Sequence, residues 1–186
     1  MIEHRPFKQL GRFQNDWLNA NYHFSFSGYH DPKRMGEGAL RVWNDDTIQP
    51  HTGFPPHGHS SMEIITYVRT GAITHKDSMG NTGRTEAGDV QVMSAGDGVQ
   101  HSEWNGADDS LVINQDANVL GATLKEGETL TYEVKEGRHG YLVLADGSIE
   151  LNGIVMNGRD GAAITGPEAV TLKGVADAEI VFVDTV

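Results

Sequence analysis

Glycine recurs along this chain at intervals, and the short segments between glycines constrain the fold class. These segments are rich in Val, Ile, Thr, Tyr and Leu. The clearest are 62–68, 72–76, 90–93, 130–134, 141–145, 148–151, 169–173 and 179–184. Short apolar runs separated by turn residues are typical of an all-β sandwich or barrel. No window has a convincing helical period, and at most one short helical turn is expected, near 15–20. We therefore predict an all-β fold.

A weak internal repeat predicts two related β units. The segments Tyr67–Thr74 (YVRTGAIT) and Val143–Glu150 (VLADGSIE) each have the pattern of a strand, a turn at glycine and a second strand. A chain of 186 residues is long enough for one domain or two small ones. The polar, turn-prone stretch 106–118 is a natural boundary. We predict an N-terminal domain at 1–110 and a C-terminal domain at 111–186.

Charge and composition exclude several classes of protein. The chain has 14 Lys and Arg against 26 Asp and Glu, a net charge of −12. Binding to phosphate backbones needs clustered cations, so direct contact with nucleic acid is not expected. Residues 1–17 do not form a secretory signal, and no apolar run approaches the roughly 20 residues that cross a bilayer. We expect a cytoplasmic protein with no membrane segment.

Cysteine is absent, so any metal site must use histidine and carboxylate ligands. Among nine histidines, His57 and His59 stand two apart, and His101 stands two before Glu103. On extended backbone, residues i and i+2 face the same side. If the two pairs converge inside a small barrel, three imidazoles and one carboxylate would hold a divalent metal with coordination positions left open. The alternatives are a solvated Pro-Gly loop for the first pair and an exposed strand end for the second.

The other candidate residues have weaker signals. Glu63 lies in an apolar stretch, where an unpaired carboxylate is costly, so it needs a cation or a hydrogen-bond donor. His75 and His139 have no such companions and are expected to be ordinary strand or turn residues. Surface placement is expected for His4, His23, His30 and His51.

Two longer segments resemble the motifs of a known superfamily. Residues 53–71 resemble the first cupin motif, and residues 88–103 resemble the second. Within them, HKDSMGN at 75–81 and MSAGDGVQHSE at 93–103 are similar to the pirin family. Upstream, four short segments are similar to the lead-in of bacterial pirin-like proteins. They are WL at 17–18, HFSFS at 23–27, HDP at 30–32 and LRVWNDD at 40–46. The resemblance covers nearly all of the first 105 residues.

This resemblance implies a bicupin of two β-barrels with one non-haem iron, held in the N-terminal barrel only. Carried over by position, the metal ligands would be His57, His59, His101 and Glu103. Glu63 would have a supporting place and would not be a ligand.

The second half is expected to be a metal-free copy of the first. Glu133 and Lys135 precede Gly147 by the same numbers of residues as His57 and His59 precede Gly71. Glu133 and Lys135 therefore take the positions of His57 and His59 in the second half. The position of His101 then falls near Leu172. The segment that joins the two halves is shorter than the resemblance leads us to expect.

The pirin resemblance also implies an activity, quercetin 2,3-dioxygenase, with a small aromatic substrate and O2 as partners. As a hypothesis, Glu103 is both ligand and general base. The alternative is a metal-dependent redox-sensing regulatory protein that acts through a protein partner. Fe(II) is the expected cofactor, while Zn, Ni, Co, Mn or Cu could occupy the same ligands in a given preparation.

Overall fold

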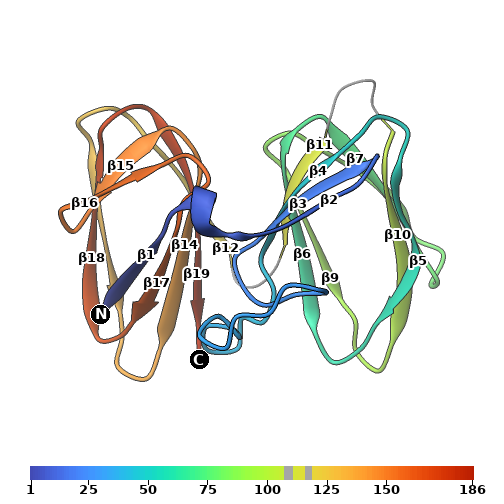
Figure 1. The fold of residues 1–186 in the computed structure, drawn as a ribbon, viewed down its shortest axis with the longest axis horizontal. Helices are drawn as coiled ribbons and strands as arrows, with labels where there is room; N and C mark the ends of the chain where they lie inside the picture. The colour runs from blue at the N-terminus through green and yellow to red at the C-terminus, as the bar shows by residue number, and fades with distance from the viewer. Residues whose placement is uncertain (107–110, 116–118) are drawn as a thin grey trace. The chain divides into compact units, whose positions relative to one another are not determined.

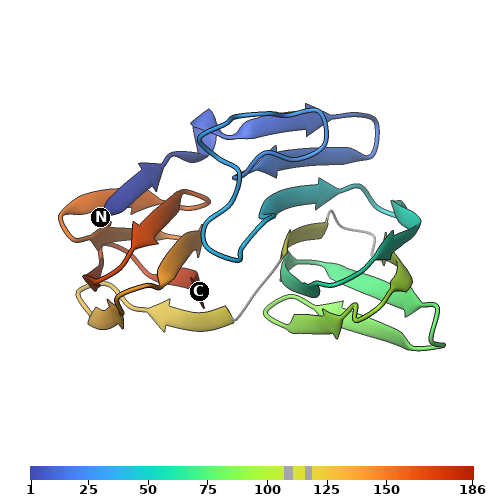
Figure 2. The same ribbon diagram turned by 90° about the horizontal axis from the view of Figure 1, so that it is seen from below.

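The computed structural model describes residues 1–106, 111–115 and 119–186, with backbone alone for 111–115 and 119. Apart from one short 3₁₀ helix, η1 (Phe7–Gln9), every regular element in these residues is a β-strand, which confirms the all-β prediction (Figure 1). No helix in the described residues has the length and hydropathy required to span a membrane. The strands form two compact units, each of two sheets that lie face to face (Figures 1 and 2).

The first unit contains Arg12–Tyr22 and the described residues from Val42 to 115. Its six-stranded sheet has the order β2 (Gly11–Gln14), β3 (Leu18–Tyr22), β4 (Asn44–Ile48), β11 (Leu111–Gln115), β6 (Glu63–Thr70), β9 (Val90–Ser94). Its four-stranded sheet has the order β5 (Gly53–His59), β10 (Val99–Asn105), β7 (Ala72–Asp77), β8 (Thr82–Glu86). This unit holds all the predicted metal ligands.

The second unit contains Met1–Gly11, His23–Arg41 and the described residues from 119 onward. Its five-stranded sheet has the order β1 (Ile2–Arg5), β17 (Gly161–Thr165), β14 (His139–Asp146), β19 (Ala178–Thr185), β12 (Val119–Leu124). Its four-stranded sheet has the order β13 (Thr129–Val134), β18 (Glu168–Gly174), β15 (Ser148–Leu151), β16 (Ile154–Asn157).

The predicted internal repeat is present in the structure. Gly71 joins β6 to β7 with φ 75°, and Gly147 joins β14 to β15 with φ 87°. A left-handed φ of this size is open to glycine without steric cost. The four-stranded sheets of the two units also have corresponding strand orders, β5-β10-β7-β8 and β13-β18-β15-β16.

The units share the chain differently from the predicted division into 1–110 and 111–186. Near the N-terminus, β1 pairs with β17 of the second unit, and residues His23–Arg41 belong to that unit as well. In the other direction, β11 pairs with β4 and β6 of the first unit. A single cut in the sequence therefore does not describe this grouping.

The helical turn expected near 15–20 is absent. Asn15 Oδ1 accepts hydrogen bonds from the backbone N–H of Trp17 (3.0 Å) and of Leu18 (2.8 Å), and β3 begins at Leu18. An Asn side chain that binds nearby backbone N–H groups forms a turn that competes with a helix.

Candidate metal centre

Two neighbouring strands bring the predicted histidines together. β5 and β10 are antiparallel, with His57 opposite His101 and His59 opposite Val99. Residues that face each other across an antiparallel pair lie on the same side of the sheet, within reach of each other's side chains. The i, i+2 spacing within β5 and the pairing with β10 together gather three imidazoles.

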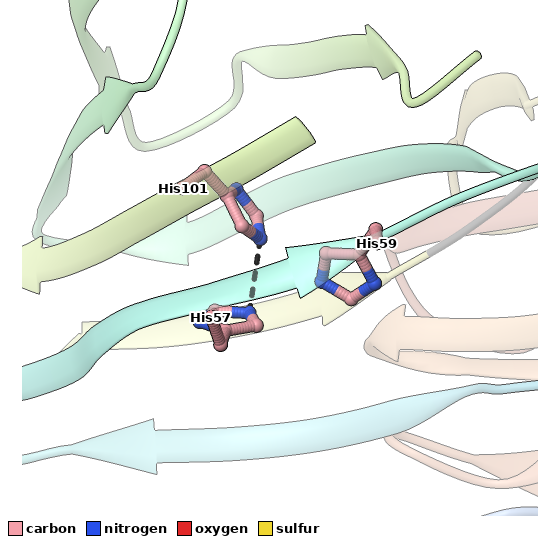
Figure 3. A group of neighbouring side chains, drawn as sticks. All are labelled: His57, His59 and His101. Atoms are coloured by element: carbon pink, nitrogen blue, oxygen red, sulfur yellow. Dashed lines mark hydrogen bonds between the residues drawn. The ribbon is translucent and has the colours of Figure 1, made fainter. Parts of the chain in front are cut away.

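The three rings face one another closely (Figure 3). One ring nitrogen from each of His57, His59 and His101 lies within 4.8 Å of the others. His57 Nε2 and His101 Nε2 are 3.0 Å apart. The ring centroids of His57 and His101 are 4.4 Å apart, and the centroid of His59 is 4.9 Å from each of the other two.

A bulge in β5 fixes the orientation of His57. Between His101 and Glu103 the register against β5 shifts, so that Glu103 lies opposite Phe54 and the extra residue falls at Pro55-Pro56. His57 Nδ1 lies 2.9 Å from the carbonyl oxygen of Pro55. Because a carbonyl only accepts, Nδ1 is the donor, and Nε2 is the ring nitrogen that faces the cluster.

Burial and repulsion by neighbouring imidazoles disfavour the protonated forms of His59 and His101. Burial, followed by the neighbouring His57, His59 and His75, lowers the pKa of His101 to about 4. Burial and then His57 lower the pKa of His59. A neutral imidazole is the form that binds a metal.

The residues present fit a divalent cation. Three nitrogen donors converge, and His59 Nε2 is buried with no hydrogen-bond partner among the described residues. A buried polar atom of this kind requires a partner. With no thiolate in the chain, the donor set suits a divalent transition metal.

Glu103 lies close to this group but is not one of its members. Its side chain is completely buried, and Oε1 accepts a hydrogen bond from Thr66 Oγ1 of β6 at 3.0 Å. Burial raises the pKa of Glu103, although the hydrogen bond from Thr66 and the nearby His57 and His75 oppose that shift. Its place as a fourth ligand remains a prediction.

His75 is a strand residue, as expected, but it also borders the site. It lies on β7 directly opposite Glu103, it is buried, and its ring centroid is 5.4 Å from that of His101. Its Nε2 is 3.5 Å from Asp77 Oδ2. The signal was available in the sequence, because His75 opens the HKDSMGN segment.

A buried acid on the opposite sheet was also missed. Asp46 of β4 is buried, and its pKa is raised well above its usual range by burial and then by Asp45 and Glu103. The signal for it was the run of polar residues Asn44–Asp46 inside a strand segment.

An open hollow of about 470 Å³ borders the centre at His59. It is lined by Gly58, His59, Ser60, Ser78, Gly98, Val99 and Gln100. Volumes of this order accommodate small organic molecules. The hollow therefore reaches the metal centre at His59.

The remaining candidates take other roles. Glu63 is exposed and accepts a hydrogen bond from Ser94 Oγ at 2.6 Å, so it has the expected donor without the expected burial. His139 Nδ1 lies 2.7 Å from Glu37 Oε1, at one end of β14.

Of the four histidines expected at the surface, His30 and His51 are exposed, and His4 is partly buried beside Asp160. The expectation for His23 was wrong. His23 is completely buried, with Nδ1 2.9 Å from the Tyr141 hydroxyl, because residues His23–Arg41 belong to the second unit and are not a surface lead-in.

The second unit has apolar residues where the first has ligands. Leu172 lies opposite Leu151 of β15 as Glu103 lies opposite His75 of β7. The pairing thus places Leu172 at the position of Glu103 and Val170 at that of His101, which corrects the expectation from counting. Both leucines and Val170 belong to a buried hydrophobic core, whereas Glu133 and Lys135 are exposed.

Comparisons with known proteins agree with this architecture. The family described as Pirin matches residues 3–119, and the family described as quercetinase C-terminal cupin domain matches residues 101–185. With the two units described above, these matches confirm the predicted bicupin fold. A pirin-like protein from Caulobacter vibrioides is 48% identical, and the alignment covers 99% of each chain.

The chain is also similar to an Escherichia coli sequence and to an Escherichia coli crystal structure. A quercetin 2,3-dioxygenase from strain K12 is 31% identical, with 99% of this chain and 98% of that protein covered. The crystal structure of bacterial pirin YhhW in complex with nickel(II) superimposes with a TM-score of 0.92 at 29% identity, covering 100% of this chain and 99% of that one.

The chain is shorter than its alignment with the Caulobacter relative. The alignment with the Caulobacter protein spans 230 positions, which exceeds the 186 residues of this chain by 44. At least 44 of those positions therefore have no counterpart here. The two family matches overlap at residues 101–119, so the overlap falls where the two halves of the chain join.

Proposed function

The chain belongs to the pirin family, and from this premise we propose that it is a metal-dependent dioxygenase of the cupin type that cleaves flavonols such as quercetin with O2. The observation that carries the proposal is the convergence of His57, His59 and His101 in one unit of the bicupin. The similar sequences include one named a quercetin 2,3-dioxygenase, and the similar structures include a pirin solved with nickel(II).

In this proposal the metal is held by His57, His59, His101 and, as the fourth ligand, Glu103. The pKa values of His59 and His101 are lowered, so both imidazoles are unprotonated at neutral pH and can bind the metal. A bound Fe(II) would supply the redox chemistry that joins O2 to the substrate, as is common at non-haem iron sites with open positions. Metals later in the divalent series bind such ligands more tightly, so the metal loaded in a preparation must be defined.

Glu103 is proposed as the general base. Its buried carboxylate has a raised pKa, so it accepts a proton more readily than an exposed glutamate does. The proton it takes belongs to the 3-hydroxyl of the flavonol. The hydrogen bond from Thr66 Oγ1 to Oε1 holds the carboxylate in place for this transfer.

The direct test uses protein loaded with Fe(II) under anaerobic conditions and then supplied with O2 and quercetin. We expect O2 uptake to match the loss of flavonol absorbance. Absence of turnover, together with binding of a protein partner that depends on the oxidation state of the metal, would favour the redox-sensing regulator instead.

The assignment of the base predicts a specific result for Glu103→Gln. Glutamine keeps the size of the side chain and an oxygen that can bind metal, but it cannot accept the proton. We expect metal content to be retained and kcat to fall by about 100-fold, within the usual range for a general base. Glu63→Gln, at an exposed glutamate on β6, is the matched control and should be unchanged. Turnover at the parental rate in Glu103→Gln would contradict the assignment.

A further inference from the structure

The strand across the first unit from the histidines carries polar side chains toward them. Asn105 Nδ2 of β10 donates to the carbonyl oxygen of Ile48 on β4 at 3.0 Å. Two residues earlier on each strand, Asp46 and Glu103 are in electrostatic contact. These two contacts place β4 across the first unit from β10 at Asn105 and Glu103, and Asn44 lies two residues before Asp46 on β4.

Asn44 and Asp46 share one face of β4, because alternate residues of a strand point to the same side. The contact between Asp46 and Glu103 identifies that face as the inner one. Thr66 of β6 reaches Glu103 from the same six-stranded sheet, which independently places Glu103 against this inner face.

Both side chains have an acceptor without a donor. Asn44 is 4% exposed and Asp46 is 3% exposed, and Asn44 Oδ1 and Asp46 Oδ1 have no hydrogen-bond partner among the described residues. Asp45, on the other face of β4, is instead paired with Arg69 (Oδ1 to Nη2, 3.5 Å). Leaving an acceptor buried and unpaired costs free energy, so such atoms in a folded protein normally meet a ligand or an ordered water.

The chemistry of a matching ligand follows from these atoms. Asn44 Oδ1 can only accept a hydrogen bond, and the Asp46 carboxyl group, whose pKa is raised, can accept or donate one. The adjacent Asp46 and Glu103 carboxyl groups disfavour an anionic ligand such as a carboxylate or a phosphate ester. A hydroxyl group is an uncharged donor of the right kind.

We propose that Asn44 and Asp46 determine substrate specificity by hydrogen bonding to hydroxyl groups of an uncharged, polyhydroxylated aromatic substrate that extends from the metal centre between the two sheets of the first unit. The inference rests on the proposed function and goes beyond it by assigning recognition to β4. A site built to bind substrate hydroxyls rejects an analogue that lacks them, because its buried acceptors then stay unpaired.

The test compares two flavonols. Quercetin and 3-hydroxyflavone share the 3-hydroxyl group, but 3-hydroxyflavone lacks the others. Their dissociation constants are measured by quenching of protein fluorescence, with Zn(II)-loaded protein and without O2, so that no substrate is consumed. We expect quercetin to bind the parental protein at least roughly tenfold more tightly, which is the effect of about one hydrogen bond.

Two variants remove the acceptors, Asn44→Leu and Asp46→Leu. In each, the ratio of the two dissociation constants should fall several-fold toward one, through weaker binding of quercetin. Thermal unfolding should not move to a lower temperature, since each variant removes an unpaired buried polar group. Thr47→Val, on the opposite face of β4, is the control and should leave the ratio unchanged.

Each outcome decides the inference. An unchanged ratio in the folded variants overturns it, as does a parental protein that binds both flavonols equally, which would mean that Asn44 and Asp46 hold ordered water only. Should a leucine variant fail to fold, Asn44→Ala and Asp46→Ala are judged by the same ratio.

Selective binding without turnover of either flavonol by the Fe(II)-loaded protein would overturn the proposed function and leave this inference standing. Turnover without selectivity would do the reverse. Failure to bind either flavonol overturns both.

Discussion

His101 is the most buried of the three clustered histidines, and its pKa is the most strongly lowered. It contacts His57 and His59 on one side and His75 on the other. Three imidazoles around it, together with burial, oppose its protonation. In the absence of a metal, protonation of His101 is therefore less favourable in the folded state than in the unfolded state.

We expect the metal-free protein to lose stability as pH falls from about 6.5 to about 4. His101 has a pKa of about 4 when folded and near 6.5 when unfolded, so between these values the unfolded state binds more protons. The free energy of unfolding therefore decreases on acidification across this window, and His101 contributes no pH dependence above it. Urea unfolding of EDTA-treated protein at several pH values measures the slope.

His101→Gln cannot be protonated and should show a clearly shallower slope in that window. His30→Gln, at an exposed position, should keep the parental slope. A His101→Gln slope equal to that of the parent would show that another group controls the acid response.

At the scale of strands, the sequence was most informative where apolar runs and glycine turns coincide. The segment predicted at 148–151 matches β15, and those at 72–76, 130–134 and 169–173 fall within one residue of β7, β13 and β18 at each end. Strands such as β4 and β5 were not predicted, because NDDTI and GFPPHGH lack the apolar alternation that marks a half-buried strand. They lack it because their inner faces carry the polar groups of the site.

The candidate site could be predicted from the sequence only in part. The spacing of His57, His59 and His101 is a local property, and the resemblance to cupin motifs supplied their convergence. The neighbours His75 and Asp46 were not predicted, because their proximity depends on which strands pair across the sheet and face each other across the unit. The HKDSMGN segment and the polar run Asn44–Asp46 mark these residues as unusual, but a local pattern does not show which strands bring them to the site.

The close approach of β5 to β10 predicts that Gly53→Ala will weaken metal binding. A Cβ at Gly53 would meet the backbone of Glu103 and Trp104, so β5 must shift away from β10, and His57 with it. We expect a loss of roughly tenfold in metal affinity, similar to other changes that misplace ligands. Competition with a chromogenic chelator measures it.

Gly58→Ala provides the matched control on the same strand. The nearest atom to a Cβ there is 3.8 Å away, an ordinary contact, so the metal affinity should stay close to that of the parent. Equal effects of the two substitutions would mean that backbone spacing between these strands does not set the ligand geometry.

At the scale of the whole molecule, two units with corresponding sheets have different interiors. The second unit places Leu172, Val170 and Leu151 in a hydrophobic core that includes residues from both of its sheets. The first unit places Glu103, His101 and His75 at the corresponding positions, with Asp46 facing them. Burying polar groups costs stability, so the unit that carries them is the one shaped by function.

This asymmetry predicts one metal equivalent per chain. Ligand atoms converge only in the first unit among the described residues, and Glu133 of the second unit, at the position that counting assigned to His57, is exposed. We expect elemental analysis after loading and desalting to give a metal-to-protein ratio close to one. His101→Ala removes a ligand and should lower that ratio toward zero, because the loss exceeds the roughly 10–100-fold typical of changes outside the ligand set. Glu133→Ala should leave the ratio at one, and a second equivalent that disappears in Glu133→Ala would contradict the division between a metal-binding unit and a packing unit.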